Sequence, residues 1–464
     1  MSDAALLNPP TTHYEFFGPA GTMVVTVATT VIPYLLYYGC ETAEQCPPTS
    51  WSAWQTRLQR LTLADLYDSH IMLLYLAWFA YLVLLYYVVP GSTKPGTVLR
   101  TGQRLLYRIN GFRSLLITCG LMFTVHRLYG PAPFIYVYDH YVHWLTASCL
   151  FATVQAVLLY IWSFRGPSTS SATATIKLKS DADLKADGNG AAASPSTGAA
   201  QPVLLALGGN SPSAFYNFFI GRELNPRLGD FDLKVFCELR PGIIGWFVLN
   251  FACLIKQSQV LNGYITESMA LIFFLQGLYI FDTLIYESSV LTTMDVTTDG
   301  FGWMLSFGDL TWVPFVFSVQ ARFLALQPVV LGPVLTATVV AIGVASFLTF
   351  RLSNSQKNIF RTDPHDPRVR GLKYIETATG SKLLISGWWG LSRHINYLGD
   401  WLFGLSWCLT TGFRSPIPYF YVLYFAVLLI HRERRDDHKC RQKYKKDWER
   451  YCSIVKYRII PGIY

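Results

Sequence analysis

The sequence predicts an all-α polytopic membrane protein with about ten transmembrane helices. Of its 464 residues, 52% are hydrophobic and only 14% are charged, a composition too apolar for an ordinary soluble domain. Apolar runs recur along the chain, and about 20 helical residues are enough to span a bilayer. Because Lys and Arg cluster beside these runs, the net charge of +9 fits membrane topology and does not indicate a nucleic-acid partner.

The first four spans are expected between residues 18 and 165, after a short cytosolic segment, residues 1–17. They cover about Gly18–Tyr38, His70–Val89, Phe112–Tyr129 and Phe134–Trp162. The loop that carries Lys94, Arg100, Arg104 and Arg108 is expected to be cytosolic, because basic loops stay on that side. Cys40 and Cys46 share an earlier loop, and they could form a disulfide if that loop is lumenal.

A change of composition then divides the chain. Residues 166–201 are small, polar and free of aromatics, which is typical of a disordered linker. The remaining region, residues 202–464, opens with a stretch from Asn217 to Trp246 that we interpret as too polar to span and as interfacial or partly re-entrant. Six spans are then expected at about Gly242–Ile255, Ser268–Val290, Gly302–Ala325, Val329–Phe350, Leu383–Leu409 and Pro418–Ile430.

Counting crossings gives a consistency check on this assignment. With the basic loop in the cytosol, an even number of spans returns residues 166–201, Lys357–Arg370 and the C-terminus to the same side. Ten spans with both termini cytosolic therefore satisfy the charge asymmetry.

Ionisable residues inside apolar runs are rare and costly, so each is a functional candidate. The run FDTLIYESSV places Asp282, Tyr286 and Glu287 within one expected span, and FGDLTWVP adds Asp309. Asp282 and Tyr286 are four residues apart and would share a helix face. Hydrogen bonding between helices is the alternative explanation for any single one of them.

The last eighty residues join apolar spans to segments rich in functional groups. On a helix beginning near His431, Asp436, Cys440 and Tyr444 recur every four residues, with Lys443 and Tyr451 close to the same stripe. A basic, solvated flank of a membrane span is the ordinary reading of such a segment. The mixture of Asp, Cys, Tyr and Trp on one basic helix instead favours a bound anionic ligand.

SGWWGLSRHINYLGD and LLIHRERRDDHKCRQKYKKDWERY resemble the C-terminal signature of the sterol reductase family. That family includes Δ14-, Δ7- and Δ24(28)-sterol reductases and the membrane domain of the lamin B receptor. The resemblance covers nearly the whole chain. It implies an NADPH-dependent enzyme of the endoplasmic reticulum membrane, with a sterol substrate and a cytosolic-face cofactor pocket built from the C-terminal helices.

The resemblance also implies which residues hold the cofactor. No GxGxxG follows a predicted strand, so a Rossmann site is not expected. Lys357 and Arg361 of QKNIFR match positions that face the cofactor phosphates, and such groups suit phosphates physically. The other implied cofactor residues are Leu384, Trp389, Asn396, Tyr397, Asp436, Cys440, Arg441, Lys443, Tyr444 and Tyr451. Arg393 and His394 are further candidates without an assigned partner.

The implied reaction requires an acid. An isolated alkene is not electrophilic, so a proton must add first, and hydride from NADPH then quenches the tertiary carbocation. Burial in an apolar pocket favours the protonated form of a carboxyl group. Glu287, Tyr286 and Asp282 are the candidate proton donors or relays, and the sequence does not rank them.

The middle of the chain favours one branch of the family. FDLKVFCELRPG and HYEFFGPAGT look most like the Δ14 branch, with the Δ7 branch as the nearest rival. A non-enzymatic membrane scaffold is less favoured, because a first span near residue 18 leaves no room for a chromatin-binding region. A transporter is disfavoured because no internal repeat is visible. The oligomeric state is not predicted.

Overall fold

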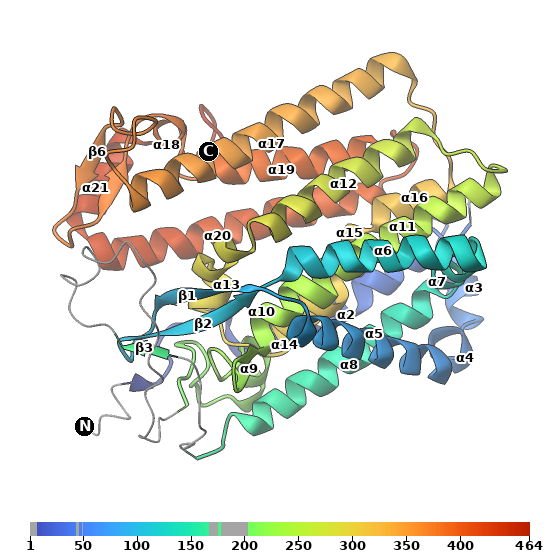
Figure 1. Cartoon of the computed structure of the whole chain (residues 1–464), viewed down its shortest axis with the longest axis horizontal. Coiled ribbons are helices and arrows are strands. Elements are labelled where there is room, and N and C mark those ends of the chain that lie inside the picture. The colour runs from blue at the N-terminus through green and yellow to red at the C-terminus, as the bar shows by residue number, and fades with distance from the viewer. Residues whose placement is uncertain (1–6, 43–45, 49, 167–174, 178–202) are drawn as a thin grey trace. The chain divides into compact units, whose positions relative to one another are not determined.

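The computed structural model describes residues 7–42, 46–48, 50–166, 175–177 and 203–464 (Figure 1). The chain divides into two compact units. Unit 1 comprises residues 1–264 and 276–318, and unit 2 comprises residues 265–275 and 319–464. Helix α12 (Glu267–Ile285) contributes its first half to unit 2 and its second half to unit 1.

Unit 1 is mainly helical. Besides part of α12, its helices are α2 (Gly18–Tyr38), α3 (Trp51–Gln59), α4 (Leu63–Leu66), α5 (Ser69–Val88), α6 (Gly111–Tyr129), α7 (Ala132–Asp139), α8 (Tyr141–Trp162), α9 (Ala214–Ile220), α10 (Leu233–Cys237), α11 (Ile243–Val260), α13 (Met294–Thr297), α14 (Trp303–Phe307) and α15 (Val313–Phe317). The expected span over residues 134–162 is broken into α7 and α8 at His140. Asp139 lies at this break and pairs with Lys256 at 2.7 Å.

The interfacial interpretation of residues 217–246 is wrong for its second half. From Leu233 the chain is helical, and residues 233–260 form one candidate membrane span. The helix tolerates polar residues because partners inside unit 1 satisfy them. Asp232 caps α10 by accepting the Val235 N–H at 3.0 Å, and Lys234 donates to three backbone carbonyls at 2.8–2.9 Å.

Short strands accompany these helices. An antiparallel sheet has the order β1 (Ser92–Val98), β2 (Gln103–Ile109), β3 (Thr175–Lys177), and β4 (Arg227–Leu228) pairs with β5 (Phe231–Asp232). The basic loop expected around residues 94–108 is thus a hairpin. Its arginines bind backbone carbonyls: Arg104 donates to Gly96 at 2.9 Å and Arg108 to Tyr86 at 2.9 Å. Most of the predicted linker, residues 166–201, lies outside the described residues.

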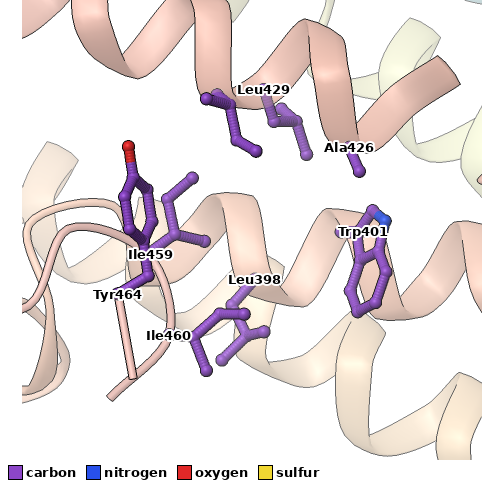
Figure 2. Close-up of a pocket in the computed structure, with 8 residues that line it drawn as sticks. Leu398, Trp401, Ala426, Leu429, Ile459, Ile460 and Tyr464 are labelled. Carbon is purple, nitrogen blue, oxygen red and sulfur yellow. The ribbon is translucent and has the colours of Figure 1, made fainter. Parts of the chain in front are cut away.

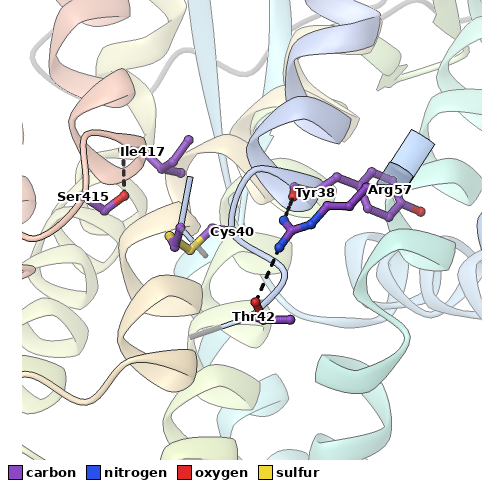
Figure 3. The surroundings of a disulfide bond; sticks show 7 residues. Tyr38, Cys40, Thr42, Arg57, Ser415 and Ile417 are labelled. Carbon is purple, nitrogen blue, oxygen red and sulfur yellow. Dashed lines mark hydrogen bonds between the residues drawn. A yellow bond between two sulfur atoms is a disulfide. The ribbon is translucent and has the colours of Figure 1, made fainter. Parts of the chain in front are cut away.

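The loop after α2 contains a disulfide between Cys40 and Cys46 (Figure 3). Arg57 of α3 donates hydrogen bonds to the Tyr38 carbonyl and to the Thr42 hydroxyl, and thereby ties α3 to the end of α2. The pairing that the sequence left open is therefore present in the structure.

Unit 2 contains the first half of α12 and the C-terminal helices. Its other elements are α16 (Val319–Leu326), α17 (Gly332–Thr362), β6 (Tyr374–Glu376), β7 (Lys382–Leu384), α18 (Trp388–Leu391), α19 (Ile395–Leu409), α20 (Phe420–Tyr444) and α21 (Lys446–Ile454). Helix α17 packs along α19, and β6, α18 and α21 gather at one end of these helices (Figure 1). Strands β6 and β7 form an antiparallel pair.

Several boundaries in unit 2 differ from expectation, and each difference affects the site. Helix α17 continues to Thr362, so Lys357 and Arg361 lie on its last turns. The span expected from Leu383 begins only at Ile395, because residues 382–384 form β7. Helix α20 runs unbroken from its apolar half into the basic segment.

Six stretches among the described residues are long and apolar enough to cross a membrane. They are Gly18–Tyr38, Leu63–Val88, Tyr141–Trp162, Leu233–Val260, Glu267–Ile285 and Gly332–Thr362. The mainly helical architecture and these stretches support a polytopic membrane protein.

Candidate functional site

The C-terminal end of α17 brings a cation onto an aromatic face. The Lys357 ammonium lies 3.7 Å from the centroid of the Trp389 ring, which is a cation–π contact. Arg361 lies one turn further along α17 at the surface. Arg361, Asp436 and Cys440 all act electrostatically on Lys357, so the ends of α17 and α20 meet around this lysine.

Local backbone geometry places Trp389. Gly387 has φ of +64°, and a Cβ there would lie 2.7 Å from the Gln356 side-chain amide, so glycine fits where other residues are strained. Gln356 accepts the Trp388 N–H at 3.0 Å, and the Trp389 indole donates to the Ser353 carbonyl at 2.9 Å. The SGWW motif therefore docks α18 on α17 and fixes the ring beneath Lys357.

An apolar cluster supports the same ring. Leu384 and Trp389 pack with Phe360 and Val369, and all four are buried. Leu384 thus acts as packing behind Trp389, and it holds β7 against the end of α17.

The segment before α19 carries a buried histidine. The His394 ring stacks on Tyr397 with centroids 4.7 Å apart and planes at 17°, and its Nε2 lies 3.6 Å from Asp436 Oδ2. Burial, then the charges of Lys357 and Arg393, lower the pKa of His394 to about 3. The imidazole is therefore neutral at physiological pH, and its approach to Asp436 is not an ion pair.

Asp436 approaches this histidine from α20, and Cys440 lies one turn further along the same helix. Cys440 Sγ lies 3.8 Å from Asp436 Oδ2. Burial, with the nearby charge of Asp436, raises the pKa of Cys440 to about 12. A thiol with so high a pKa is not a nucleophile at neutral pH, which agrees with its predicted role as a contact residue.

The predicted stripe ends earlier than the sequence indicated. Helix α20 stops at Tyr444, and Lys445 takes a φ of +49°, so Tyr451 belongs to α21 and not to the same helix face. The two helices still converge, because Cys440 and Tyr444 pack against the buried Trp448 and Tyr451. Tyr451 therefore joins the group by tertiary packing.

Two of the predicted basic residues have partners on the helix surface. Arg441 Nε donates to Asp437 Oδ2 at 2.8 Å, and the Lys443 ammonium lies 4.9 Å from the Tyr444 ring centroid. Both side chains are exposed. They contribute positive charge at the rim, whereas Lys357 lies within the site.

Sequence reasoning missed Asp437, which links three elements. It accepts the Trp448 indole N–H at 2.9 Å besides the bond from Arg441, and Arg393 Nη1 lies 3.8 Å from its Oδ1. The i,i+4 spacing of Asp437 and Arg441 is a local signal for that pair. No local spacing indicates the pairing of Asp437 with Arg393, which is 44 residues away along the chain.

Glu433 forms a second ion pair that the sequence did not indicate. It accepts two hydrogen bonds from Arg458 Nη1 at 2.9 and 3.1 Å.

Two buried polar atoms in the site are without a hydrogen-bond partner among the described residues. They are Asn396 Oδ1 and Arg393 Nε. Asn396 uses its amide nitrogen to bond Asn354 at 3.3 Å. Buried groups of this kind usually bind water or a ligand, so an amide acceptor at the start of α19 and a guanidinium donor just before it are available for a further hydrogen bond. The set suits an anionic ligand with a flat ring.

An apolar recess of about 190 Å³ lies between α19, α20 and the last residues (Figure 2). Its lining is Leu398, Trp401, Ala426, Leu429, Ile430, Ile459, Ile460 and Tyr464. Because typical ligand pockets hold roughly 300–1,000 Å³, this recess is too small to enclose a whole sterol.

The three candidate donors lie in unit 1, two of them beyond the helix that was expected to hold them. Helix α12 ends at Ile285, so Tyr286 and Glu287 follow it instead of lying within a span. The Tyr286 N–H still bonds the Asp282 carbonyl at 3.0 Å. Tyr286 is 48% exposed, and Asp282 is half-buried.

Glu287 is held in a buried ion pair. Its Oε1 lies 3.0 Å from Arg240 Nη2, and its Oε2 accepts the Gly111 N–H at 2.7 Å. Burial favours the neutral acid, but both oxygens already accept bonds from groups that only donate. A proton on Glu287 would displace one of those bonds.

The apolar helices and the polar, basic end of unit 2 define a multi-pass membrane protein with a candidate nucleotide site. The chain belongs to the ergosterol biosynthesis ERG4/ERG24 family, which matches residues 10–464. The predicted membership of the sterol reductases is therefore confirmed.

Individual members are similar over nearly their full length. The Delta(14)-sterol reductase erg24 of Schizosaccharomyces pombe is 45% identical, over 97% of each chain. The Delta(14)-sterol reductase of Ascobolus immersus is 42% identical, over 97% of this chain and 99% of its own. The Delta(14)-sterol reductase ERG24 of Saccharomyces cerevisiae is 40% identical, over 99% of both.

Proposed function

We propose that the chain reduces the Δ14 double bond of a sterol, with NADPH as the reductant. The observation that carries the reaction is similarity of 40–45% over nearly the whole length to three Delta(14)-sterol reductases. The predicted preference for Δ14 over Δ7 and over a non-enzymatic scaffold agrees with these relatives.

Unit 2 is the proposed NADPH site. Lys357 and Arg361 would meet phosphates, Trp389 and Tyr397 would contact flat rings, and Asn396 would bind a polar edge. The side of the site formed by α20 and α21 would consist of Asp436, Cys440, Tyr444 and Tyr451. Leu384 would pack behind the site. Positive charge at its rim would come from Arg441 and Lys443. Support comes from the cation–π pair and from Asn396 Oδ1, which has no hydrogen-bond partner in the described part of the chain. When bound, the cofactor supplies a hydride.

Unit 1 is the proposed source of the proton, with Asp282, Tyr286 and Glu287 as the donors or relays expected from the sequence. Protonation at the less substituted alkene carbon leaves a tertiary cation, so the acid must keep its proton until substrate binds. The paired carboxylate of Glu287 is the least suited of the three, because both its oxygens are occupied.

We further propose ten crossings of the endoplasmic reticulum membrane with both termini cytosolic. The ten would be α2, α5, α6, α8, α10–α11, α12, α14–α16, α17, α19 and α20. The Cys40–Cys46 disulfide supports a lumenal loop, because disulfides form in that oxidising compartment. We expect an N-glycosylation acceptor site inserted beside Cys46 to be glycosylated, and one inserted at residues 99–102 not to be. The reverse pattern would contradict this orientation.

The reaction is tested by turnover with purified, detergent-solubilised protein and NADPH. A Δ8,14-sterol and a Δ5,7-sterol are offered in parallel, and products are identified by mass spectrometry. We expect loss of the Δ14 bond alone. Reduction of only the Δ7 bond would contradict the assigned substrate but not the proposed cofactor site. Reduction of neither bond would contradict the proposed reductase activity.

A further inference from the structure

Two helical stretches of unit 1 each contain a π-helical turn. Residues Glu238–Gly242 form one between α10 and α11, and Gly308–Trp312 form the other between α14 and α15. Such turns are rare and are found frequently at functional sites. A proline lies in or just after each turn, Pro241 and Pro314. Proline lacks an N–H, and it therefore loosens the regular hydrogen-bond ladder at both places.

The two turns lie in contact with one another. A Cβ atom at Gly242 would be 2.7 Å from the Asp309 carbonyl oxygen, so only glycine allows the backbones to approach this closely. Each turn also carries one carboxylate, Glu238 on the first and Asp309 on the second. The two carboxylates act electrostatically on each other.

Asp309 differs from three other buried carboxylates of unit 1, those of Glu287, Asp232 and Glu223. It is 9% exposed, and among the described residues no group donates a hydrogen bond to its carboxylate. Glu287 instead has Arg240, Asp232 has Arg227 at 2.9 Å, and Glu223 has Arg165 at 2.6 Å.

Lys234, a buried cation that acts electrostatically on Asp309, already uses its hydrogen-bond donors elsewhere. Lys234 has three N–H donors, and they go to the carbonyls of Asp295, Val296 and Asp299. An ionised carboxylate without a partner in an apolar span would cost several kcal/mol. Asp309 is therefore held as the neutral acid, which the first step of the reaction requires.

We propose that Asp309 protonates the sterol double bond and that Glu238 then returns a proton to it. The assignment rests on the protonation-first mechanism proposed above. The Asp309 O–H bond breaks as a C–H bond forms at the less substituted alkene carbon, and the alkene electron pair forms that bond. Bound NADPH would supply the hydride that neutralises the tertiary cation. Glu238, which is half-buried, passes a proton to the Asp309 carboxylate and regains one from water.

Single-turnover kinetics separate these roles. With NADPH and a Δ8,14-sterol, D309N should slow the first turnover by about 10²–10⁴-fold, the usual contribution of a general acid. E238Q should leave the first turnover unchanged, because Asp309 starts protonated, and should slow the later ones at least tenfold. A purely structural role would not produce this split.

Three comparisons complete the experiment. D139N removes a surface carboxylate of the same unit and should change neither phase. D282N, Y286F and E287Q are measured in parallel as the competing donors.

The proposal is overturned if D309N keeps the parental first turnover, or if E238Q slows the first and later turnovers alike. The E238Q measurement decides the matter even if D309N does not fold. Failure of the parent protein to reduce the Δ14 bond would instead reject the proposed function.

Discussion

At the scale of single residues, the site rests on contacts between side chains far apart in sequence. Lys357 reaches Trp389 from α17, and His394 lies between Tyr397 and Asp436. The resemblance predicted Lys357, Trp389 and Asp436 as cofactor residues, because they lie in long motifs. It did not identify Asp437, whose structural role depends on contacts with Trp448 and Arg393, residues distant from it in the sequence.

Arg361 and Asp436 test the cofactor site directly. A charge-assisted hydrogen bond contributes about 1.5–3 kcal/mol, so R361A should weaken NADPH binding roughly 10- to 100-fold. D436N should weaken it as well, while both variants remain folded in detergent. Equilibrium titration with NADPH measures the effect.

The matched control for Arg361 is R368A, which removes a nearby exposed arginine that pairs with Asp366 at the surface. It should bind NADPH as the parent does. Parental affinity in both R361A and D436N would show that the cofactor is held elsewhere.

At the scale of elements, the sequence predicted the long apolar helices well and the polar segments poorly. Helices α2, α5 and α17 were predicted because each contains a long apolar run, and run length can be read directly from the sequence. The FDLKVFCELRPG segment was misread because its helix depends on partners that are remote in sequence, such as the carbonyls that bind Lys234. Tyr451 was placed on the wrong helix because Lys445 adopts a positive φ that no local motif announces.

The junction of α20 and α21 depends on the charge of Asp437. Burial raises the pKa of Asp437, but the bonds from Arg441 and Trp448 and the charges of Arg441 and Arg458 lower it below its usual range. A lowered pKa gives stability that is complete above the unfolded value, about 3.9, and is lost as pH falls through the folded value. D437N should therefore lower the free energy of unfolding at pH 7 by about 1–3 kcal/mol. The apparent Tm should fall accordingly.

Thermal unfolding in detergent at pH 7 and near pH 3 measures this difference. The gap between D437N and the parent should narrow at the lower pH. D366N, which breaks only an exposed pair, should have little effect, since surface pairs contribute about 0–1 kcal/mol. An equal gap at both pH values would mean that Asp437 acts through packing and not through charge.

At the scale of the whole molecule, composition and charge asymmetry were enough to predict a helical, multi-pass membrane protein. They could not predict the paired π-helical turns, since such turns depend on a close approach of two backbones at Gly242 and Asp309. We assign the reductant and the proton to different units. The polar end of unit 2 would hold the reductant, and the buried carboxylates of unit 1 would supply the proton.

Isotope labelling tests most directly that the reaction adds to the sterol a hydride from NADPH and a proton that comes from solvent. The protein is given a Δ8,14-sterol with NADPH deuterated at the transferable C4 position, and in a second reaction with unlabelled NADPH in D₂O. We expect one deuterium from NADPH at the ring-fusion carbon of the former Δ14 bond, and one from solvent at its neighbour, each located by mass spectrometry and NMR. A product that carries no deuterium from labelled NADPH would contradict the account.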